Sequence, residues 1–136
     1  MDESLMRRRA AEARVGRLAT TRADGRPHLV PCCFVVQGDV VYTAVDDVKA
    51  KRTPELLRLD NIRRNPDVSF LIDDYVEDWS ALWWIRVDGR AHLAEPGSPE
   101  QKVATELLAA KYEQYRAEPP SGPAIAIEVT SWRAWP

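Results

Sequence analysis

The sequence predicts a mainly β domain with flanking helices (α+β), arranged as a small antiparallel barrel. Short runs rich in β-branched and aromatic residues lie on both sides of turn signals at Asp24-Gly25 and Gln37-Gly38-Asp39, the pattern of antiparallel hairpins. The expected order is three strands, a helix, two strands, a helix and a final strand. Helices at those places cannot be parallel crossovers for every strand, so a barrel with helices packed at its ends fits best.

Length and composition narrow the class of protein. The 136 residues fit one domain spanning residues 1–136, and the net charge of -2 gives no support for a nucleic-acid binder driven by overall charge. No apolar run approaches the roughly 20 residues that a membrane span needs. The basic N-terminus has no apolar segment after it, unlike a secretory signal, so a cytoplasmic protein is expected.

The first half of the chain predicts a lead-in helix over residues 2–13 and a three-stranded meander. The strands are expected at Gly16–Thr21, Pro27–Val36 and Asp39–Val45. Pro31 cannot donate a ladder hydrogen bond, which predicts an edge or a bulge in the second strand. Cys32 and Cys33 are adjacent, so they cannot form an ordinary disulfide with each other; on a strand they point to opposite faces, as small packing residues. No Cys or His cluster accompanies them, and no metal site is expected.

A basic run precedes the next helix. Lys49, Lys51 and Arg52 come directly before Thr53-Pro54, which is a good N-cap followed by proline in the first helical position, and the helix ends at Asn65-Pro66. Free N–H groups and the helix dipole favour an anion at such an N-terminus, and three cations add charge-assisted contacts suited to a phosphate. The alternative is a solvated basic loop.

The second half predicts strands at Val68–Asp73, Ala81–Leu93 and Ala124–Thr130, with a helix from Pro99 to about Arg116. The acidic loop 73–78 has no accompanying histidine or ordered ligand spacing, so a charged surface loop is favoured over a metal site.

The long strand Ala81–Leu93 has one apolar face and one face that carries Trp84, arginines and His92. Clustered Trp and Arg are enriched at interfaces, so this second face predicts a subunit interface or a ligand wall, with a heavy hydrophobic core as the alternative. His28 and His92 are assigned structural roles because neither has an obvious nucleophile beside it.

These residues, taken in order, resemble a known family. Gly16–Thr21, Asp24–His28 and Val30–Pro31 look like the opening of the pyridoxamine 5'-phosphate oxidase-like split β-barrel proteins. The segments 49–52 and 59–66 look like their phosphate-binding and following helical segments. The segments 79–84 and 87–89 are similar to the coenzyme F420-dependent subgroup, and the resemblance extends from about Val15 to Trp135.

The resemblance implies a six-stranded antiparallel split β-barrel of the FMN-binding split barrel type, which dimerises with its cofactor at the subunit interface. It also implies that the cofactor performs the hydride chemistry while the protein positions it, and no catalytic acid or base is assigned. The resemblance implies three sets of cofactor-binding residues. Lys49, Lys51 and Arg52 would bind the cofactor phosphate. The strand-end residues Thr20, Thr21, Pro31 and Cys32 would flank the ring system, and Trp84 and Trp135 would cover it.

The implied function is an F420-dependent oxidoreductase that transfers hydride between the deazaflavin and an unidentified, planar small molecule. Arg58, Arg63 or Arg86 are candidates for the acidic tail of F420. Three alternatives stay open: an FMN-binding oxidase or reductase of the same family, a non-catalytic cofactor-binding protein, and a structural dimer module with no cofactor. True pyridoxamine phosphate oxidases carry a further basic C-terminal segment, and this sequence ends at Trp135-Pro136, which argues against pyridoxamine phosphate as the substrate.

Overall fold

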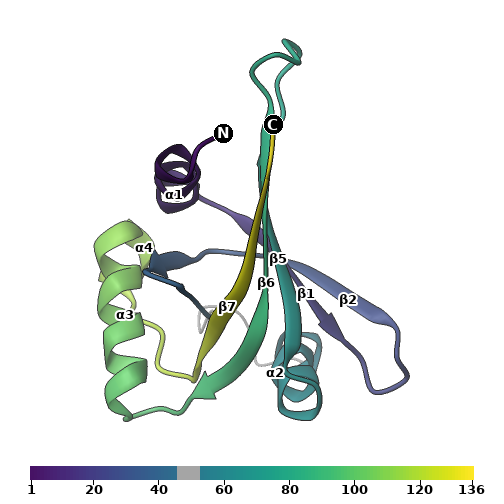
Figure 1. The fold of residues 1–136 in the computed structure, drawn as a ribbon. Helices are drawn as coiled ribbons and strands as arrows, with labels where there is room; N and C mark the ends of the chain where they lie inside the picture. The colour runs from purple at the N-terminus through teal and green to yellow at the C-terminus, as the bar shows by residue number, and fades with distance from the viewer. Residues whose placement is uncertain (46–52) are drawn as a thin grey trace.

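The computed structural model describes residues 1–45 and 53–136, which form a curled antiparallel sheet with helices against its ends (Figure 1). The helices and strands have the following bounds: α1 (Glu3–Glu12), β1 (Gly16–Thr21), β2 (Pro27–Cys32), β3 (Val35–Gln37), β4 (Val40–Ala44), α2 (Thr53–Arg64), β5 (Asp67–Asp74), β6 (Trp83–Ala94), α3 (Pro99–Lys111), α4 (Glu113–Ala117) and β7 (Ala124–Trp135). The predicted class, mainly β with flanking helices, is confirmed.

The sheet has seven strands in the order β2-β1-β5-β6-β7-β4-β3, and every pairing is antiparallel. The predicted count of six strands is therefore one too low. The predicted three-stranded meander is wrong as well. The expected single strand Pro27–Val36 is two strands, β2 and β3, which lie at opposite edges of the sheet. Pro31 lies on the edge strand β2, as its missing N–H predicts.

A side chain from far along the sequence explains the break between β2 and β3. Phe34 is fully buried, and its backbone N–H donates to the Tyr112 hydroxyl at 3.0 Å instead of to a neighbouring strand. The same hydroxyl lies 3.0 Å from the Phe34 carbonyl and 2.9 Å from the Arg14 carbonyl. The chain can therefore leave the ladder at Phe34 without an unpaired buried amide, and turn from one edge of the sheet to the other.

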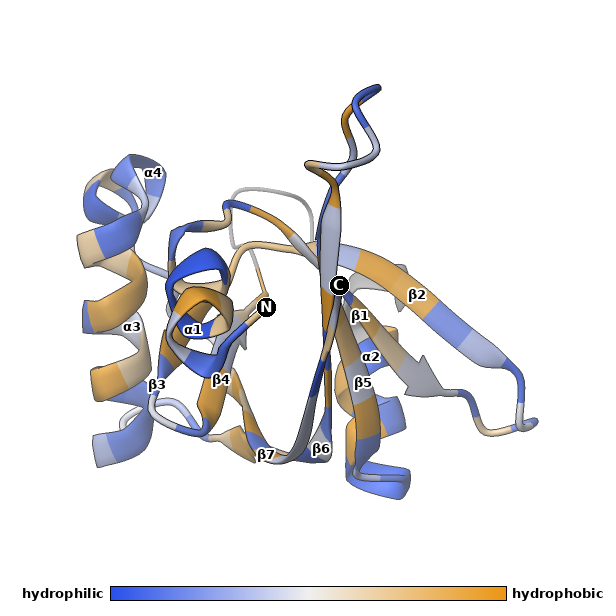
Figure 2. Ribbon diagram, turned by 45° about the horizontal axis from the view of Figure 1, so that its top comes forward, coloured by the Kyte–Doolittle hydropathy of each residue, from blue (hydrophilic) through white to orange (hydrophobic). Residues whose placement is uncertain are grey.

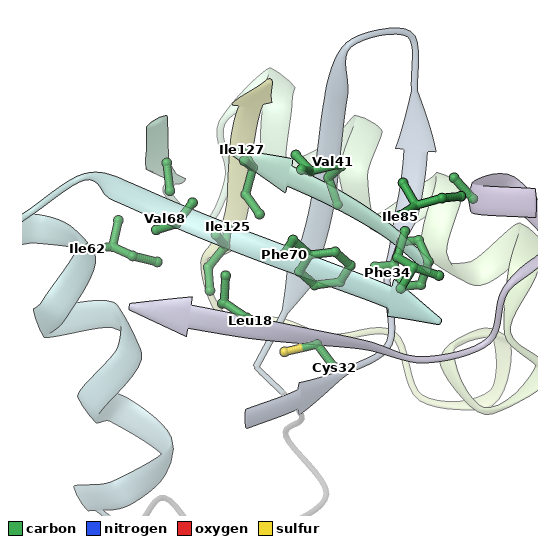
Figure 3. Packing of buried hydrophobic residues seen from close by; sticks show 14 of the residues in the cluster. Leu18, Cys32, Phe34, Val41, Ile62, Val68, Phe70, Ile85, Ile125 and Ile127 are labelled. Carbon is green, nitrogen blue, oxygen red and sulfur yellow. The ribbon is translucent and has the colours of Figure 1, made fainter. Parts of the chain in front are cut away.

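The inner face of the sheet forms the main core, shown in Figure 3. Phe34 and Phe70 meet edge to face with ring centroids 5.0 Å apart. Around them lie fully buried aliphatic side chains from several strands, including Leu18, Val41, Ile85, Ile125 and Ile127. Burying each of these contributes about 1.5–3 kcal/mol, so this face fixes which side of each strand points outward.

The helices close the open ends of the curled sheet. Asp2 caps α1 by accepting from the Leu5 N–H at 2.8 Å, and α1 packs through Met6 and Ala10. α2 contributes Leu59 and Ile62 to the core. The helix predicted to run to Arg116 is interrupted at Tyr112, which has extended backbone angles and separates α3 from α4.

β6 and β7 are the longest strands and shape the outer face. Their register shifts between Asp88 and Gly89, and beyond this irregularity β7 continues to Trp135, five residues past the predicted end at Thr130. The connection between β5 and β6 projects away from the rest of the chain, and hydrophilic residues colour much of its tip (Figures 1 and 2). Among the described residues, no helix combines the length and the apolar character needed to cross a bilayer.

Candidate functional site

The predicted cofactor-binding residues fall into three groups in the structure. Lys49, Lys51 and Arg52 lie outside the described residues, so their role in binding a phosphate stays a prediction. Thr20, Thr21, Pro31 and Cys32 lie on the β1–β2 hairpin. Trp84 and Trp135 lie elsewhere, side by side on β6 and β7.

Thr20 and Thr21 point to opposite faces of β1. Thr20 is only 3% exposed, and its hydroxyl accepts from the Asn61 side-chain amide at 3.0 Å, while Arg64 donates to the Asn61 oxygen at 3.0 Å. This network joins α2 to β1 and commits the Thr20 hydroxyl to the fold. Thr21 instead faces a pocket on the outer side of the sheet.

That outer pocket has a volume of about 510 Å³, and its lining combines apolar surface with several polar side chains. Its floor holds two short polar contacts: the Ser69 hydroxyl donates to Asp88 at 2.6 Å, and Arg90 pairs with Asp67 at 3.1 Å. The remaining lining comes from the end of β1, the start of β2, Val68 on β5, Gly89 in the middle of β6 and Thr130 on β7. The pocket can therefore present hydrogen-bond partners to a flat polar molecule, and every charge in it already has an opposite partner.

Pro31 and Cys32 also separate to the two faces of their strand. Pro31 is exposed on the outer face, whereas Cys32 is 6% exposed and belongs to the core. Burial raises the pKa of the Cys32 thiol, more than the nearby Arg58 charge lowers it, so the group is a neutral packing residue at neutral pH. Its predicted packing role is confirmed, and only its backbone is left to contact a ligand.

Trp84 and Trp135 are direct neighbours across β6 and β7. Trp135 is 45% exposed. Trp84 also pairs with Asp73 near the end of β5, whereas the Thr21 pocket lies at the Asp67 end of the same strand. One copy of the chain therefore does not bring the two tryptophans to the pocket.

Two residues that the sequence did not single out together lie near each other where α2 packs on the β1–β2 hairpin, which is called here the β2–α2 junction. The Arg58 Nε and the His28 Nδ1 are buried, and neither has a hydrogen-bond partner among the described residues. Burial, followed by the charges of Arg22 and Arg58, holds the pKa of His28 below its usual value. The sequence carried one usable signal, a polar pair at positions 58 and 61 of a helix whose neighbours Leu59 and Ile62 are buried.

This junction fits a ligand with an anionic side chain. A buried guanidinium nitrogen without a partner is costly, and an oxyanion supplies both the charge and the acceptors it lacks. In the described part of the chain no carboxylate forms an ion pair with Arg58. The described residues hold no cluster of three metal-ligating side chains. The arrangement can bind and orient a charged molecule, and it shows no nucleophile–base pair.

Comparison with known proteins places this geometry in a family. The family model described as pyridoxamine 5'-phosphate oxidase matches residues 3–136. The fold is similar to that of a conserved hypothetical protein from Mycobacterium tuberculosis, with a TM-score of 0.79, 23% identity and coverage of 99% of this chain and 84% of that one.

Two further structures share the fold. A heme storage protein from Vibrio cholerae gives a TM-score of 0.76 at 15% identity, covering 98% of this chain and 92% of that one. An FAD-binding protein from Mesorhizobium loti gives a TM-score of 0.70 at 21% identity, and the match covers 98% of this chain and 92% of that one. No match was found among curated proteins. Because the family model covers almost the whole sequence, the chain belongs to the pyridoxamine 5'-phosphate oxidase family.

Proposed function

We propose that this protein binds a flavin-type cofactor and works as an oxidoreductase, with the deazaflavin coenzyme F420 as the first candidate and FMN as the alternative. The observation that carries the proposal is the buried Arg58 Nε, which has no hydrogen-bond partner among the described residues, in a chain whose family model spans residues 3–136. The similarity of segments 79–84 and 87–89 to the F420-dependent subgroup favours F420. The fold shared with an FAD-binding protein supports the flavin alternative.

The chain's own residues would bind and orient the cofactor rather than transfer protons. When bound, the ring system supplies the hydride chemistry. Arg58 and the predicted run of Lys49, Lys51 and Arg52 would hold the anionic side chain, and polar side chains in the outer pocket beside Thr21 offer hydrogen-bond partners for a polar ring edge. These contacts would hold the cofactor ring in one position, and a hydride transfer requires such a fixed geometry.

We also propose that the working unit is a homodimer with the cofactor at the subunit interface. Apolar side chains are exposed on the outer face of the sheet and its rim, where Leu29 is 66%, Leu71 37% and Trp135 45% exposed. A second copy packed on this face would bury them, and it would bring its own Trp84 and Trp135 toward a pocket that they do not reach within one chain. Light scattering coupled to size exclusion should give twice the 15.4 kDa chain mass.

A titration of the five tryptophans with F420, FMN and hemin, each added separately, tests the proposal. Micromolar quenching by F420 with weak FMN binding would support the deazaflavin function and justify a screen of hydride acceptors. The opposite preference would identify a flavin oxidase or reductase. Binding of hemin alone, or of none of the three, would overturn the proposal.

A non-catalytic cofactor carrier is the second candidate, because every role proposed above for the described residues is a binding role. It shares every binding residue with the enzyme. Stopped-flow oxidation of the bound reduced cofactor by a panel of planar acceptors separates the two, since a carrier would leave the cofactor reduced.

A further inference from the structure

We propose that Cys33 and Lys111 form a site of covalent modification, at which an acyl group from a thioester passes from the cysteine sulfur to the lysine amine. Neither residue is among the predicted cofactor-binding residues, so the inference does not depend on the proposed function. Cys33 lies in the chain between β2 and β3, and Lys111 is the last residue of α3, which packs against β3 and β4 (Figure 2).

Lys111 is held in place by a backbone carbonyl and two aromatic rings. Its ammonium donates to the Phe34 carbonyl at 2.9 Å, and it lies 4.1 Å from the centre of the Phe34 ring and 5.4 Å from that of Tyr112. No carboxylate in the described part of the chain forms an ion pair with it. The side chain is half-buried, so the amine is positioned by the fold and still open to a reagent on one side.

The surroundings of Lys111 favour the neutral amine, which is the nucleophilic form. The Arg14 guanidinium donates to the Lys111 carbonyl at 3.1 Å and lies 4.6 Å from the centre of the Tyr112 ring. Burial, followed by this positive charge, lowers the pKa of Lys111 to about 8 from 10.5, although the nearby Cys33 acts in the opposite direction. Desolvation and a neighbouring cation are the two features that activate lysine nucleophiles in enzymes.

Cys33 lies where it can deliver an acyl group to this amine. It directly precedes Phe34, whose carbonyl accepts from Lys111, and its side chain packs against a buried cluster that includes Leu108 and Tyr112. Leu108 lies three residues before Lys111, on the same side of α3. Cys33 is a half-buried thiol, close enough to Lys111 to act on it electrostatically.

The transfer takes two steps and needs no oxidant or reductant. First, the Cys33 sulfur attacks the carbonyl of the acyl thioester, and the donor's thiol leaves with the proton that the Cys33 thiol gives up. Second, the neutral Lys111 amine attacks the same carbonyl. The C–S bond breaks as the C–N bond forms, and the proton lost by the nitrogen returns to the Cys33 sulfur. The products are an N-acyl-lysine and the donor's thiol.

The test compares two acetyl donors on the full chain. Wild-type protein and Cys33→Ser are incubated with acetyl-coenzyme A or with acetyl phosphate, and mass spectrometry of peptides locates the acetyl groups over time. Acetyl phosphate acylates an amine directly, so it reports on Lys111 without the thiol. Lys102, an exposed lysine on the same helix, is the internal control. Circular dichroism verifies that each variant keeps its β structure.

We expect acetyl-coenzyme A to modify Lys111 about tenfold faster than Lys102 at neutral pH, because far more of the Lys111 amine is neutral there. Cys33→Ser should slow this reaction by roughly tenfold and leave the reaction with acetyl phosphate within about twofold. In Lys111→Arg, the acetyl group should stay on Cys33, where neutral hydroxylamine removes it as a thioester.

The pH dependence gives a second readout. The rate at Lys111 should level off above its pKa of about 8, whereas the rate at Lys102 should keep rising toward the ordinary lysine value.

Three results would overturn the site. Equal rates at Lys111 and Lys102 would show that the amine is not activated. An unchanged reaction of Cys33→Ser with acetyl-coenzyme A would show that the sulfur carries no acyl group. Equal slowing with both donors in Cys33→Ser would show that the cysteine only supports the local structure.

Discussion

Two helices that pack on the sheet, α3 and α2, hold partly buried cations in opposite ways. On the α3 side, the Lys111 ammonium donates to the Phe34 carbonyl at 2.9 Å and lies 4.1 Å from the centre of the Phe34 ring. On the α2 side, the Arg58 Nε is buried with no partner in the described part of the chain. Both positions are partly shielded from water, so the difference is not one of exposure alone.

This difference indicates that Lys111 has a structural role, whereas Arg58 is available to bind a ligand. On the α3 side, Tyr112 and Lys111 satisfy the N–H and the carbonyl of Phe34, and they thereby fix the chain where it leaves the ladder. Native proteins rarely leave buried polar atoms unpaired, and exceptions tend to mark functional positions. The α3 side should therefore govern stability and the α2 side should govern binding.

The largest effect is expected from Tyr112→Phe. It removes the hydroxyl that accepts from the fully buried Phe34 N–H, which leaves that amide unpaired. The free energy of unfolding should fall by about 1–3 kcal/mol in urea denaturation. Tyr75→Phe is the control, because Tyr75 is 62% exposed; a loss as large as that of Tyr112→Phe would contradict the account.

A smaller effect should appear in the pH dependence of stability. Burial, with the Arg14 charge, lowers the pKa of Lys111 to about 8 from 10.5, so between these values the unfolded chain binds more protons than the folded one. The free energy of unfolding should therefore rise with pH from about 8 to 10, above which the raised pKa of Tyr112 acts in the opposite direction.

Lys111→Met should remove that rise, because the titrating amine is gone. Lys102→Met, an exposed lysine on the same helix, should keep it. Urea denaturation at a series of pH values measures both. An equal slope in the wild-type protein and in Lys111→Met would show that Lys111 is not the group responsible.

The smallest effect on stability is expected for Arg58→Gln without ligand. Since Arg58 has no carboxylate partner in the described chain, its removal should change the free energy of unfolding by no more than about 0.5 kcal/mol. A loss comparable to that of Tyr112→Phe would mean that Arg58 supports the fold, and the comparison between the two sides would collapse.

Local signals allowed most of the elements to be predicted. Gly25 and Gly38 have φ of 86° and 60°, the left-handed conformation that the two turn signals require, and Pro31 lies on an edge strand. The break at Phe34 was missed because the apolar run continues through it. Its cause, Tyr112, lies 78 residues away, and no local pattern reports such a contact.

The site was less predictable for the same reason. Strand alternation separates neighbouring side chains to opposite faces, but it could not show that Asn61 occupies the Thr20 hydroxyl. The pairing of Trp84 with Trp135 depends on strand register, which short-range patterns do not determine across the gap between β6 and β7. Arg58 and His28 meet only through the packing of α2 on the hairpin.

The most direct test of the division between the two sides measures stability with and without ligand in three proteins. Urea denaturation of the wild-type chain, Tyr112→Phe and Arg58→Gln is carried out alone and with FMN or F420 at a fixed concentration near 100 times the wild-type Kd, where a ligand adds about 2.7 kcal/mol. The account predicts that Tyr112→Phe starts lower and keeps the full increment, whereas Arg58→Gln starts at the wild-type value and loses much of the increment. The account would be contradicted if the ligand stabilised Arg58→Gln by the full increment, or if it no longer stabilised Tyr112→Phe.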